Sequence, residues 1–181
     1  MSLELLVDTV GDRKVDAFLA RWVQERIPRC PPFAGHYRAL GIGRNGTLVA
    51  AAVFTDLITW VGGGNVYISF AADAPVVQQG SQRTRAAMGI RTPHWATRQT
   101  VNFILGLPFE QFGVTRITAL IDRSFTASRK LVTDVGFKQE GVARQILPHA
   151  RDAVIYGLLK SEFLGGRFGP RSSPALVSQA A

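Results

Sequence analysis

The stretch from Val114 to Lys160 restricts the possible folds most, because strand and helix signals follow one another closely in it. Residues Val114–Ile121 are rich in β-branched and apolar side chains and end at Asp122, a pattern that is typical of a strand. Ser124 favours the N-cap of a helix, and Gly136 favours a left-handed helix end. The sequence therefore predicts a strand followed by a short helix.

The remainder of this stretch predicts two further strands. Phe137–Ile146 is expected to be the first of them, and a turn at Pro148 follows it. Ala153–Leu159 is an almost unbroken apolar run, as expected of a strand that is buried on both faces. The order is therefore strand, helix, strand, turn and strand. A helix that begins directly after a strand offers free backbone N–H groups, which is a place to bind phosphate.

A hairpin gives the clearest signal in the first half of the chain. Asn45-Gly46 suits a type I′ turn, in which both central residues need positive φ. The segments Tyr37–Gly43 and Thr47–Leu57 on either side are therefore predicted to pair as antiparallel strands. Leu3–Val7 and Val66–Ala72 have the apolar patterns of two more strands.

Two more helices are predicted from periodicity. Asp12–Ile27 places five apolar residues on one face, namely Val15, Leu19, Trp22, Val23 and Ile27. Its charged residues Arg13, Asp16, Arg21 and Glu25 are expected to lie away from that face. The second helix is predicted to begin near 95–97 and to end at Leu107, because Pro108 cannot donate a backbone hydrogen bond.

Composition argues against several classes of protein. No apolar run approaches the ~20 residues that a membrane span needs, so no membrane partner is expected. Met1–Val10 lacks the basic region of a secretory signal. Cys30 is the only cysteine, and the three histidines show no ligand spacing, so neither a disulfide within the chain nor a metal site is expected. A cytoplasmic location is the resulting expectation.

The charge balance favours anionic partners. The net charge is +8 and the pI is near 10.5. Coenzyme A, nucleic acid and an acidic surface all suit such a chain, and charge does not choose among them. Part of the excess lies in one loop, at Arg83, Arg85 and Arg91, where a solvated basic segment is the simple interpretation.

The C-terminal stretch resembles the GNAT superfamily of acyl-CoA N-acyltransferases. Members have a helix of pattern N-x-x-[AS]-x-x-L-Y-x-x-x-G-F, often followed by E-G. The residues that match at the right spacing are Ser128, Leu131, Gly136, Phe137, Glu140 and Gly141. Asp152–Leu158 is similar to the last strand of many members, and with the arginine-rich loops it resembles members encoded by bacteriophages and prophages.

This resemblance implies an α/β fold of the α+β type, with a mixed, mostly antiparallel central sheet flanked by helices. It implies one domain over residues 1–163, and the Gly, Pro, Ser and Arg residues of 164–181 indicate a flexible tail. It also implies that acetyl-CoA, or another acyl-CoA, binds where two adjacent parallel strands splay apart, here Val66–Ala72 and Val114–Ile121. The residues expected to contact this substrate are Ser69, Phe70, Ala71, Ala96, Thr97, Arg98, Ser128 and Lys130.

Three positions depart from the family pattern. Phe125 stands where members have asparagine, Val132 where they have a tyrosine that is often the general acid, and Val101 where the phosphate loop has glycine. Tyr156 on the last strand is therefore a candidate proton carrier, and a buried strand tyrosine is the structural alternative. His36 is a second candidate, because histidine titrates near neutral pH, and an exposed or structural histidine is its alternative.

Three hypotheses follow. The leading one is an acyl-CoA-dependent N-acyltransferase with an unknown amine acceptor, and such proteins commonly form homodimers. The second is a DNA-modifying enzyme on the same fold, because the His36-Tyr37 pair and the basic charge resemble the phage Mom proteins. The third is a non-catalytic protein that kept the fold and lost the site, since fold alone does not imply function.

Overall fold

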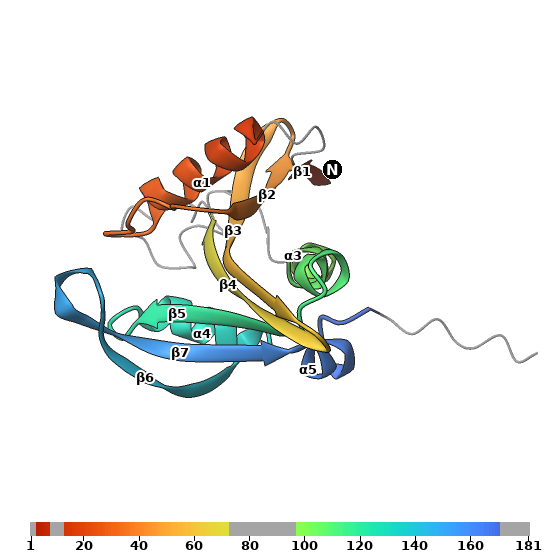
Figure 1. The fold of residues 1–181 in the computed structure, drawn as a ribbon. Helices are drawn as coiled ribbons and strands as arrows, with labels where there is room; N and C mark the ends of the chain where they lie inside the picture. Colours follow the sequence, from red (N-terminus) through yellow and green to blue (C-terminus); the bar gives the residue numbers. More distant parts are fainter. Residues whose placement is uncertain (1–2, 8–12, 73–96, 171–181) are drawn as a thin grey trace, which may run out of the picture.

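The computed structural model describes residues 3–7, 13–72 and 97–170, so the basic 73–94 segment and Ala96 lie outside the described residues. Its elements follow one another as strands and helices around one sheet (Figure 1). They are β1 Leu3–Val7, α1 Lys14–Arg26, β2 Tyr37–Arg44, β3 Thr47–Trp60, β4 Gly63–Ala72, α3 Arg98–Gln111, β5 Arg116–Asp122, α4 Thr126–Asp134, β6 Lys138–Leu147, a 3₁₀ turn Pro148–Ala150, β7 Arg151–Leu159 and α5 Lys160–Gly165.

The described strands form one mixed sheet in the order β1-β2-β3-β4-β5-β7-β6. Only the β4–β5 pair is parallel, and all other neighbours are antiparallel. The predicted hairpin is confirmed: β2 pairs with β3, and Asn45 and Gly46 have φ of 52° and 73°. The mixed, mostly antiparallel sheet with flanking helices is also confirmed.

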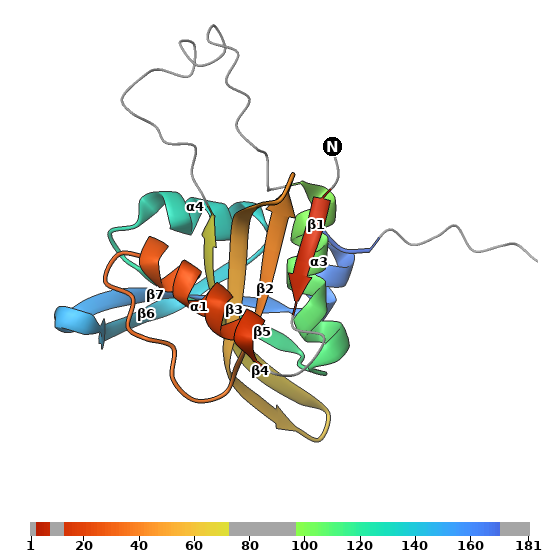
Figure 2. The ribbon, with the colours of Figure 1, turned by 90° about the horizontal axis from the view of Figure 1, so that it is seen from above.

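Helix α1 covers one face of β2, β3 and β4 (Figures 1 and 2). Leu19 and Val23 of the predicted apolar face are fully buried against Ala51 and Val53 of β3. Gly41 of β2 permits this close approach, because a Cβ there would lie 2.7 Å from Leu19 Cδ2. Strand alternation therefore sends one set of β3 side chains to α1 and the other set to the opposite face.

Helices α3 and α4 lie on that opposite face (Figure 2). The apolar side of α3, which includes Val101, Ile104 and Leu105, packs on the main core. Phe163 of α5 joins it, with its ring 5.4 Å from the ring of Phe109. The face of the sheet that α1 covers is the α1 side, and the face that α3 and α4 cover is the α3 side.

The prediction that Asp16 lies away from the buried face of its helix is wrong. The Asp16 side chain is only 1% exposed. Its Oδ1 accepts a hydrogen bond of 2.9 Å from the Ala39 backbone N–H, and its Oδ2 lies 3.2 Å from Arg38 Nε. A carboxylate can be buried when such partners replace water, so Asp16 joins α1 to the start of β2.

The prediction that Pro108 ends its helix is also wrong. Helix α3 begins at Arg98, close to the expected start, but continues through Pro108 to Gln111. Leu107 and Phe109 on either side are buried in the main core. Burial of this last turn outweighs the hydrogen bond that proline cannot donate.

Ser124 does not cap helix α4, contrary to prediction. The N-cap is Phe125, which makes no side-chain capping bond. The Ser124 N–H and hydroxyl instead lie 2.9 and 2.7 Å from Asp122 Oδ1, so the aspartate forms a turn at the end of β5. Gly136 ends the helix with φ of 110°, in agreement with the expected positive φ.

The chain after β7 packs on helix α3 as far as it is described. Phe168 contacts the main core, and its carbonyl accepts a 2.8 Å hydrogen bond from Asn102 Nδ2. The Gly169 carbonyl accepts one of 3.1 Å from Arg98 Nη2. The first residues of the expected tail are therefore held against α3, and residues 171–181 lie outside the described part.

Candidate active site

The parallel strands β4 and β5 separate after a short paired region. Their ladder joins Asn65–Tyr67 to Arg116–Thr118, and within the described strands no pair follows. β4 continues to Ala72 on the β3 side, and β5 continues to Asp122 on the β7 side. The facing edges of Ile68–Ala72 and Ala119–Asp122 therefore leave backbone groups without a partner strand across the gap, and such groups need other hydrogen-bond partners.

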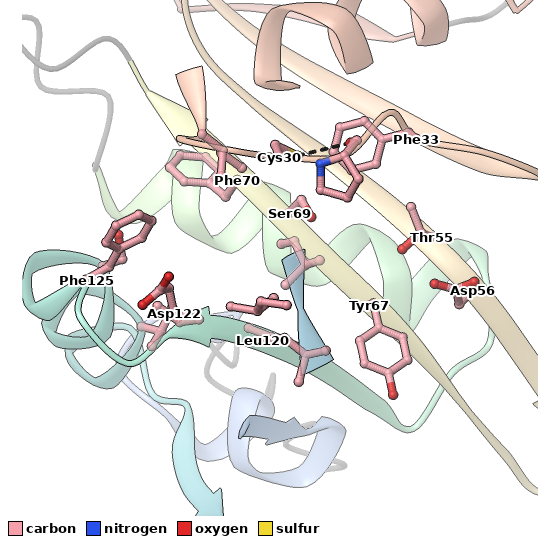
Figure 3. Close-up of a pocket in the computed structure, with 18 of the residues that line it drawn as sticks. Cys30, Phe33, Thr55, Asp56, Tyr67, Ser69, Phe70, Leu120, Asp122 and Phe125 are labelled. Atoms are coloured by element: carbon pink, nitrogen blue, oxygen red, sulfur yellow. Dashed lines mark hydrogen bonds between the residues drawn. The ribbon is translucent and has the colours of Figure 1, made fainter. Parts of the chain in front are cut away.

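A cavity of about 880 Å³ lies at this gap (Figure 3). Ile68 and Phe70 of β4 line it with side chains that belong to the α3 side. Tyr67 and Ser69 alternate with them and belong to the α1 side, as does Leu120 of β5. Because residues of both sides line it, the cavity passes through the sheet where the strands splay. Its size suits a small organic ligand.

The α3 side of the cavity is mainly apolar. Its described lining on α3 and α4 consists of Val101, Ile104, Leu105, Phe125, Ser128, Leu131, Val132 and Val135. Phe125 and Val132, which depart from the family pattern, are thus cavity residues rather than solvent-facing ones. No residue of α4 is fully buried, because part of its apolar side faces the cavity instead of packed protein. A ligand with an apolar arm would cover these side chains.

The α1 side of the cavity is formed by segments far apart in the sequence. The loop 27–34, the end of β3 and the turn after β6 all contribute to it. A β-bulge between Thr55 and Ile58 contains Asp56, whose φ is 50°. Figure 3 shows Thr55, Asp56 and Tyr67 on one side of the cavity, with Leu120 on the neighbouring strand. This wall is the part of the site that sequence patterns missed.

Asp122 carries the buried charge of the cavity wall. Its side chain is 7% exposed, and Oδ2 forms a short ion pair with Arg151 Nη1. Both residues line the cavity, and Oδ1 is occupied by Ser124. The sequence signal for Asp122 was a carboxylate directly after an apolar strand, which predicted only the strand end.

Cys30 lies on the wall formed by loop 27–34. Its Sγ lies 3.4 Å from the Pro31 carbonyl, to which it can donate a weak hydrogen bond. Burial raises the pKa of the Cys30 thiol above its ordinary value, because the charged thiolate loses hydration. The thiol is therefore mostly protonated at neutral pH.

Among the predicted site residues that the structure describes, three meet at the cavity and the others do not line it. Ser69, Phe70 and Ser128 are part of its described lining. Ala71 packs against the α1 cluster instead. Lys130 pairs with Asp134 at 2.8 Å on the exposed side of α4.

The remaining predicted residues have structural contacts of their own. Thr97 caps α3, since its Oγ1 accepts a 3.1 Å hydrogen bond from the Thr100 N–H, while Arg98 holds the Gly169 carbonyl. Tyr156 is 2% exposed, and Arg129 Nε donates to its hydroxyl at 3.2 Å. His36 is exposed and does not line the cavity.

A second, smaller hollow of about 470 Å³ lies between α4 and the β6–β7 edge. Arg123, Arg129 and Arg144 line it together with one carboxylate, that of Asp152. Asp152 accepts a 3.0 Å hydrogen bond from the Gln145 N–H and lies 4.0 Å from Arg123 Nη1. The hollow is therefore basic overall, in contrast to the large cavity.

The described ranges contain neither a metal-binding group of side chains nor a membrane-spanning helix. No group of three or more histidine, cysteine or acidic side chains suited to a metal ion occurs within residues 3–7, 13–72 and 97–170. None of the helices in those ranges is long and apolar enough to cross a membrane.

Comparison with known proteins gives structural matches only. No protein-family model matches this chain, and no curated protein matches it significantly. Among solved structures, a chimera of the spermidine N-acetyltransferase SpeG from Vibrio cholerae and hSSAT has a TM-score of 0.60 and 15% identity, over 92% of this chain and all of that one. The chain has the GNAT fold.

Two further solved structures extend this result. The ribosomal-protein-S5-alanine acetyltransferase from Vibrio fischeri matches 68% of this chain at 16% identity, with a TM-score of 0.51. Mycobacterium smegmatis RimJ, in complex with CoA-disulfide, matches 71% at 21% identity, with a TM-score of 0.50. This chain spans 61% and 55% of those two proteins. The two strands that were expected to splay apart, Val66–Ala72 and Val114–Ile121, correspond to β4 and β5.

Proposed function

We propose that this protein is an acyl-CoA-dependent N-acyltransferase, with acetyl-CoA as the expected donor and an amine as the acceptor. One observation carries the proposal: a cavity of ligand size passes through the sheet where the two parallel strands separate. A passage of this kind lets two substrates approach one point from opposite faces of the sheet. Holding both reactants in line supplies a large part of the catalysis of a group transfer.

The donor would occupy the α3 side. The pantetheine arm of coenzyme A carries two amide groups, which can hydrogen-bond to the free edge of β4 near Ser69 and Phe70, as a strand would. Its methylene and dimethyl groups would cover the apolar side of α4 around Leu131 and Val132. RimJ was solved with CoA-disulfide, which supports a coenzyme A site in this fold.

The amine would enter from the α1 side. Its nitrogen attacks the thioester carbonyl carbon, a C–N bond forms, the C–S bond breaks, and the proton lost by nitrogen must reach a base while the thiolate leaves. Asp56 is the lining carboxylate of the α1 side that can accept this proton, because Asp122 is already paired with Arg151. The phenol of Tyr67 can donate a proton to the leaving thiolate. We therefore assign proton removal to Asp56 and protonation of the thiolate to Tyr67.

Tyr156 and His36 stay predictions from the sequence, as do contacts of Ala71, Ala96, Thr97, Arg98 and Lys130 with the donor. Substitution of Tyr156 by phenylalanine tests the first of them directly. If Tyr156 only accepts the Arg129 hydrogen bond, Tyr156→Phe keeps kcat. A loss of kcat as large as the loss in Tyr67→Phe would instead assign the proton transfer to Tyr156.

A thermal-melt titration with acetyl-CoA and with free CoA tests donor binding. A ligand present at 100 times its Kd that binds only the native state stabilises it by about 2.7 kcal/mol, which gives a clear rise in Tm. Release of the CoA thiol in the presence of mixed primary amines then tests transfer. No shift with either ligand at millimolar concentration would end the acyltransferase proposal and favour a non-catalytic protein.

Two tryptophan variants of helix α4 locate the donor. Ser128→Trp adds a bulky side chain to the cavity wall and should weaken acetyl-CoA binding at least about tenfold, equivalent to 1.4 kcal/mol. Thr133→Trp is the matched control, because Thr133 is exposed on the same helix and does not line the cavity. Equal affinity in both variants would show that the donor binds elsewhere.

The basic hollow supports the alternative of a nucleic-acid-directed enzyme on the same fold. Its three arginines and the net charge of +8 suit phosphate groups. The same melts with short duplex DNA at two salt concentrations distinguish this function. A shift with DNA that disappears at high salt, without any shift with acetyl-CoA, would favour the alternative.

A further inference from the structure

The acceptor class follows from the chemistry of the α1 side of the cavity, and this inference rests on the proposed acyltransferase function. Most of the described side chains there are apolar or aromatic, and they come from five separate segments. Representative ones are Phe33 from the loop, Ile58 from β3, Tyr67 from β4, Leu120 from β5 and Leu147 from β6. An acceptor that fills this space must offer an apolar body, because polar groups would lose hydrogen bonds to water without replacement.

The charges on the cavity wall cancel. Among the described lining residues, Arg29 and Arg151 are positive and Asp56 and Asp122 are negative. Asp122 and Arg151 pair with each other, so neither is available to a substrate without breaking that ion pair. A polyamine with several ammonium groups would need several free carboxylates, and this wall does not provide them. A single amine is the charge state that fits.

Asp56 is the group that matches such an amine. The β-bulge holds it at positive φ, a conformation that aspartate and asparagine adopt more readily than most residues. No hydrogen bond or ion pair to Asp56 occurs among residues 13–72 and 97–170. Asp56 lines the cavity, and Figure 3 shows it on β3, toward the Tyr67 end and away from the Asp122 end. It can therefore attract one ammonium group to an otherwise apolar wall.

The geometry points to a monoamine with an apolar or aromatic body as the acceptor, for which the α1 side supplies an apolar surface and Asp56 supplies one negative charge. Phe33 of this surface lies next to Tyr37, with ring centroids 6.3 Å apart. An arylalkylamine such as phenethylamine has both properties. Ethanolamine has the charge without the apolar body, and spermidine has too many charges.

The experiment measures kcat/KM with acetyl-CoA for phenethylamine, hexylamine, ethanolamine and spermidine by release of the CoA thiol. Phenethylamine and hexylamine should exceed ethanolamine and spermidine by at least about tenfold, since burial of a few methylene groups is worth that much. A preference for spermidine or ethanolamine would overturn the inference. Acetyl-CoA melts run on the same sample identify the separate case in which the donor itself does not bind and the proposed function fails.

Variants of the wall sharpen the result. Asp56→Asn keeps a residue that tolerates positive φ, and it should raise KM for phenethylamine about tenfold while the Kd for acetyl-CoA stays unchanged. Asp134→Asn, an exposed carboxylate outside the cavity, is the control and should change neither constant. Phe33→Ala should reduce the ratio of phenethylamine to ethanolamine. An unchanged ratio in Phe33→Ala together with an unchanged KM in Asp56→Asn would overturn the inference.

Discussion

The two halves of the sheet are packed to different degrees. β2, β3 and β4 carry α1 on one face and α3 on the other, and four consecutive β3 residues, Ala50–Val53, are completely buried. β5, β7 and β6 are covered by α4 on the α3 side, and no residue of α4 is fully buried. The cavity lies at the border of these halves. The comparison indicates that the first half supplies stability, whereas the second half leaves room that a substrate would fill.

The strongest test of this contrast compares two leucines on helices. Leu19→Ala removes a fully buried side chain of α1 and should lower the free energy of unfolding by about 2–5 kcal/mol. Leu131→Ala removes a half-buried side chain of α4 that lines the cavity and should cost about 1 kcal/mol. Urea denaturation measures both. For acetyl-CoA affinity the order should be reversed, because only Leu131→Ala should weaken binding. Equal losses of unfolding free energy in the two variants would contradict the difference between the two halves of the sheet.

The next effect concerns the buried carboxylate of the first half. Asp16→Ala leaves the Ala39 N–H without its acceptor and should cost about 1–3 kcal/mol. Asp134→Ala breaks only an exposed pair with Lys130 and should cost at most about 0.5 kcal/mol. Both values come from denaturation midpoints at neutral pH. A cost for Asp16→Ala no larger than that of the control would mean that water replaces the carboxylate.

A smaller effect is expected where the C-terminal segment meets α3. Asn102→Ala removes the hydrogen bond to the Phe168 carbonyl and should cost about 1 kcal/mol. It should also speed proteolysis after Arg167, because this segment would be held less firmly. Gln99→Ala on the same helix is the control. Identical proteolysis rates for the two variants would show that the contact does not hold the segment.

The smallest effect is a pH dependence in the second half. The hydrogen bond from Arg116 lowers the pKa of Glu140, so this pair stabilises the fold above the pKa of an unfolded glutamate. That stabilisation is lost as pH falls through the lowered pKa. Because the Glu140 side chain is 40% exposed, its contribution should stay below about 1 kcal/mol.

Denaturation of Glu140→Gln between neutral and acid pH measures this contribution. The variant should lose less stability than the parent on acidification, since the pair is already absent from it. Glu25→Gln, which breaks an exposed pair with Arg21 on α1, is the control from the first half. A steeper acid loss in Glu140→Gln than in the parent would contradict the sign of the expected pKa shift.

Local signals were sufficient for most of the fold. Asn45-Gly46 predicted its hairpin because turn conformation depends on the two residues themselves. Asp16 and Pro108 were placed wrongly because tertiary contacts decided their positions: a partner N–H from β2 in one case and burial of the last helical turn in the other. Propensity alone contains neither contact.

Less of the candidate site than of the fold could be predicted from the sequence. Ser69, Phe70 and Ser128 were identified because a family pattern covers them, and all three line the cavity. Thr55, Asp56 and the loop 27–34 were missed, since their proximity depends on a bulge and on the path of the chain after α1. Residues brought together from distant segments leave no local pattern in a single sequence.

Cys30 is a natural site for selective chemical labelling of the protein. As the sole cysteine of the chain and part of the cavity wall, it directs any thiol reagent to one position. Because burial raises its pKa, alkylation should be slow at neutral pH and faster in alkaline buffer. The emission of a fluorophore attached there should change when a ligand fills the cavity. In the unlabelled protein, the degree to which amines and acyl-CoA species slow alkylation of the thiol would rank them by binding, without any need for turnover.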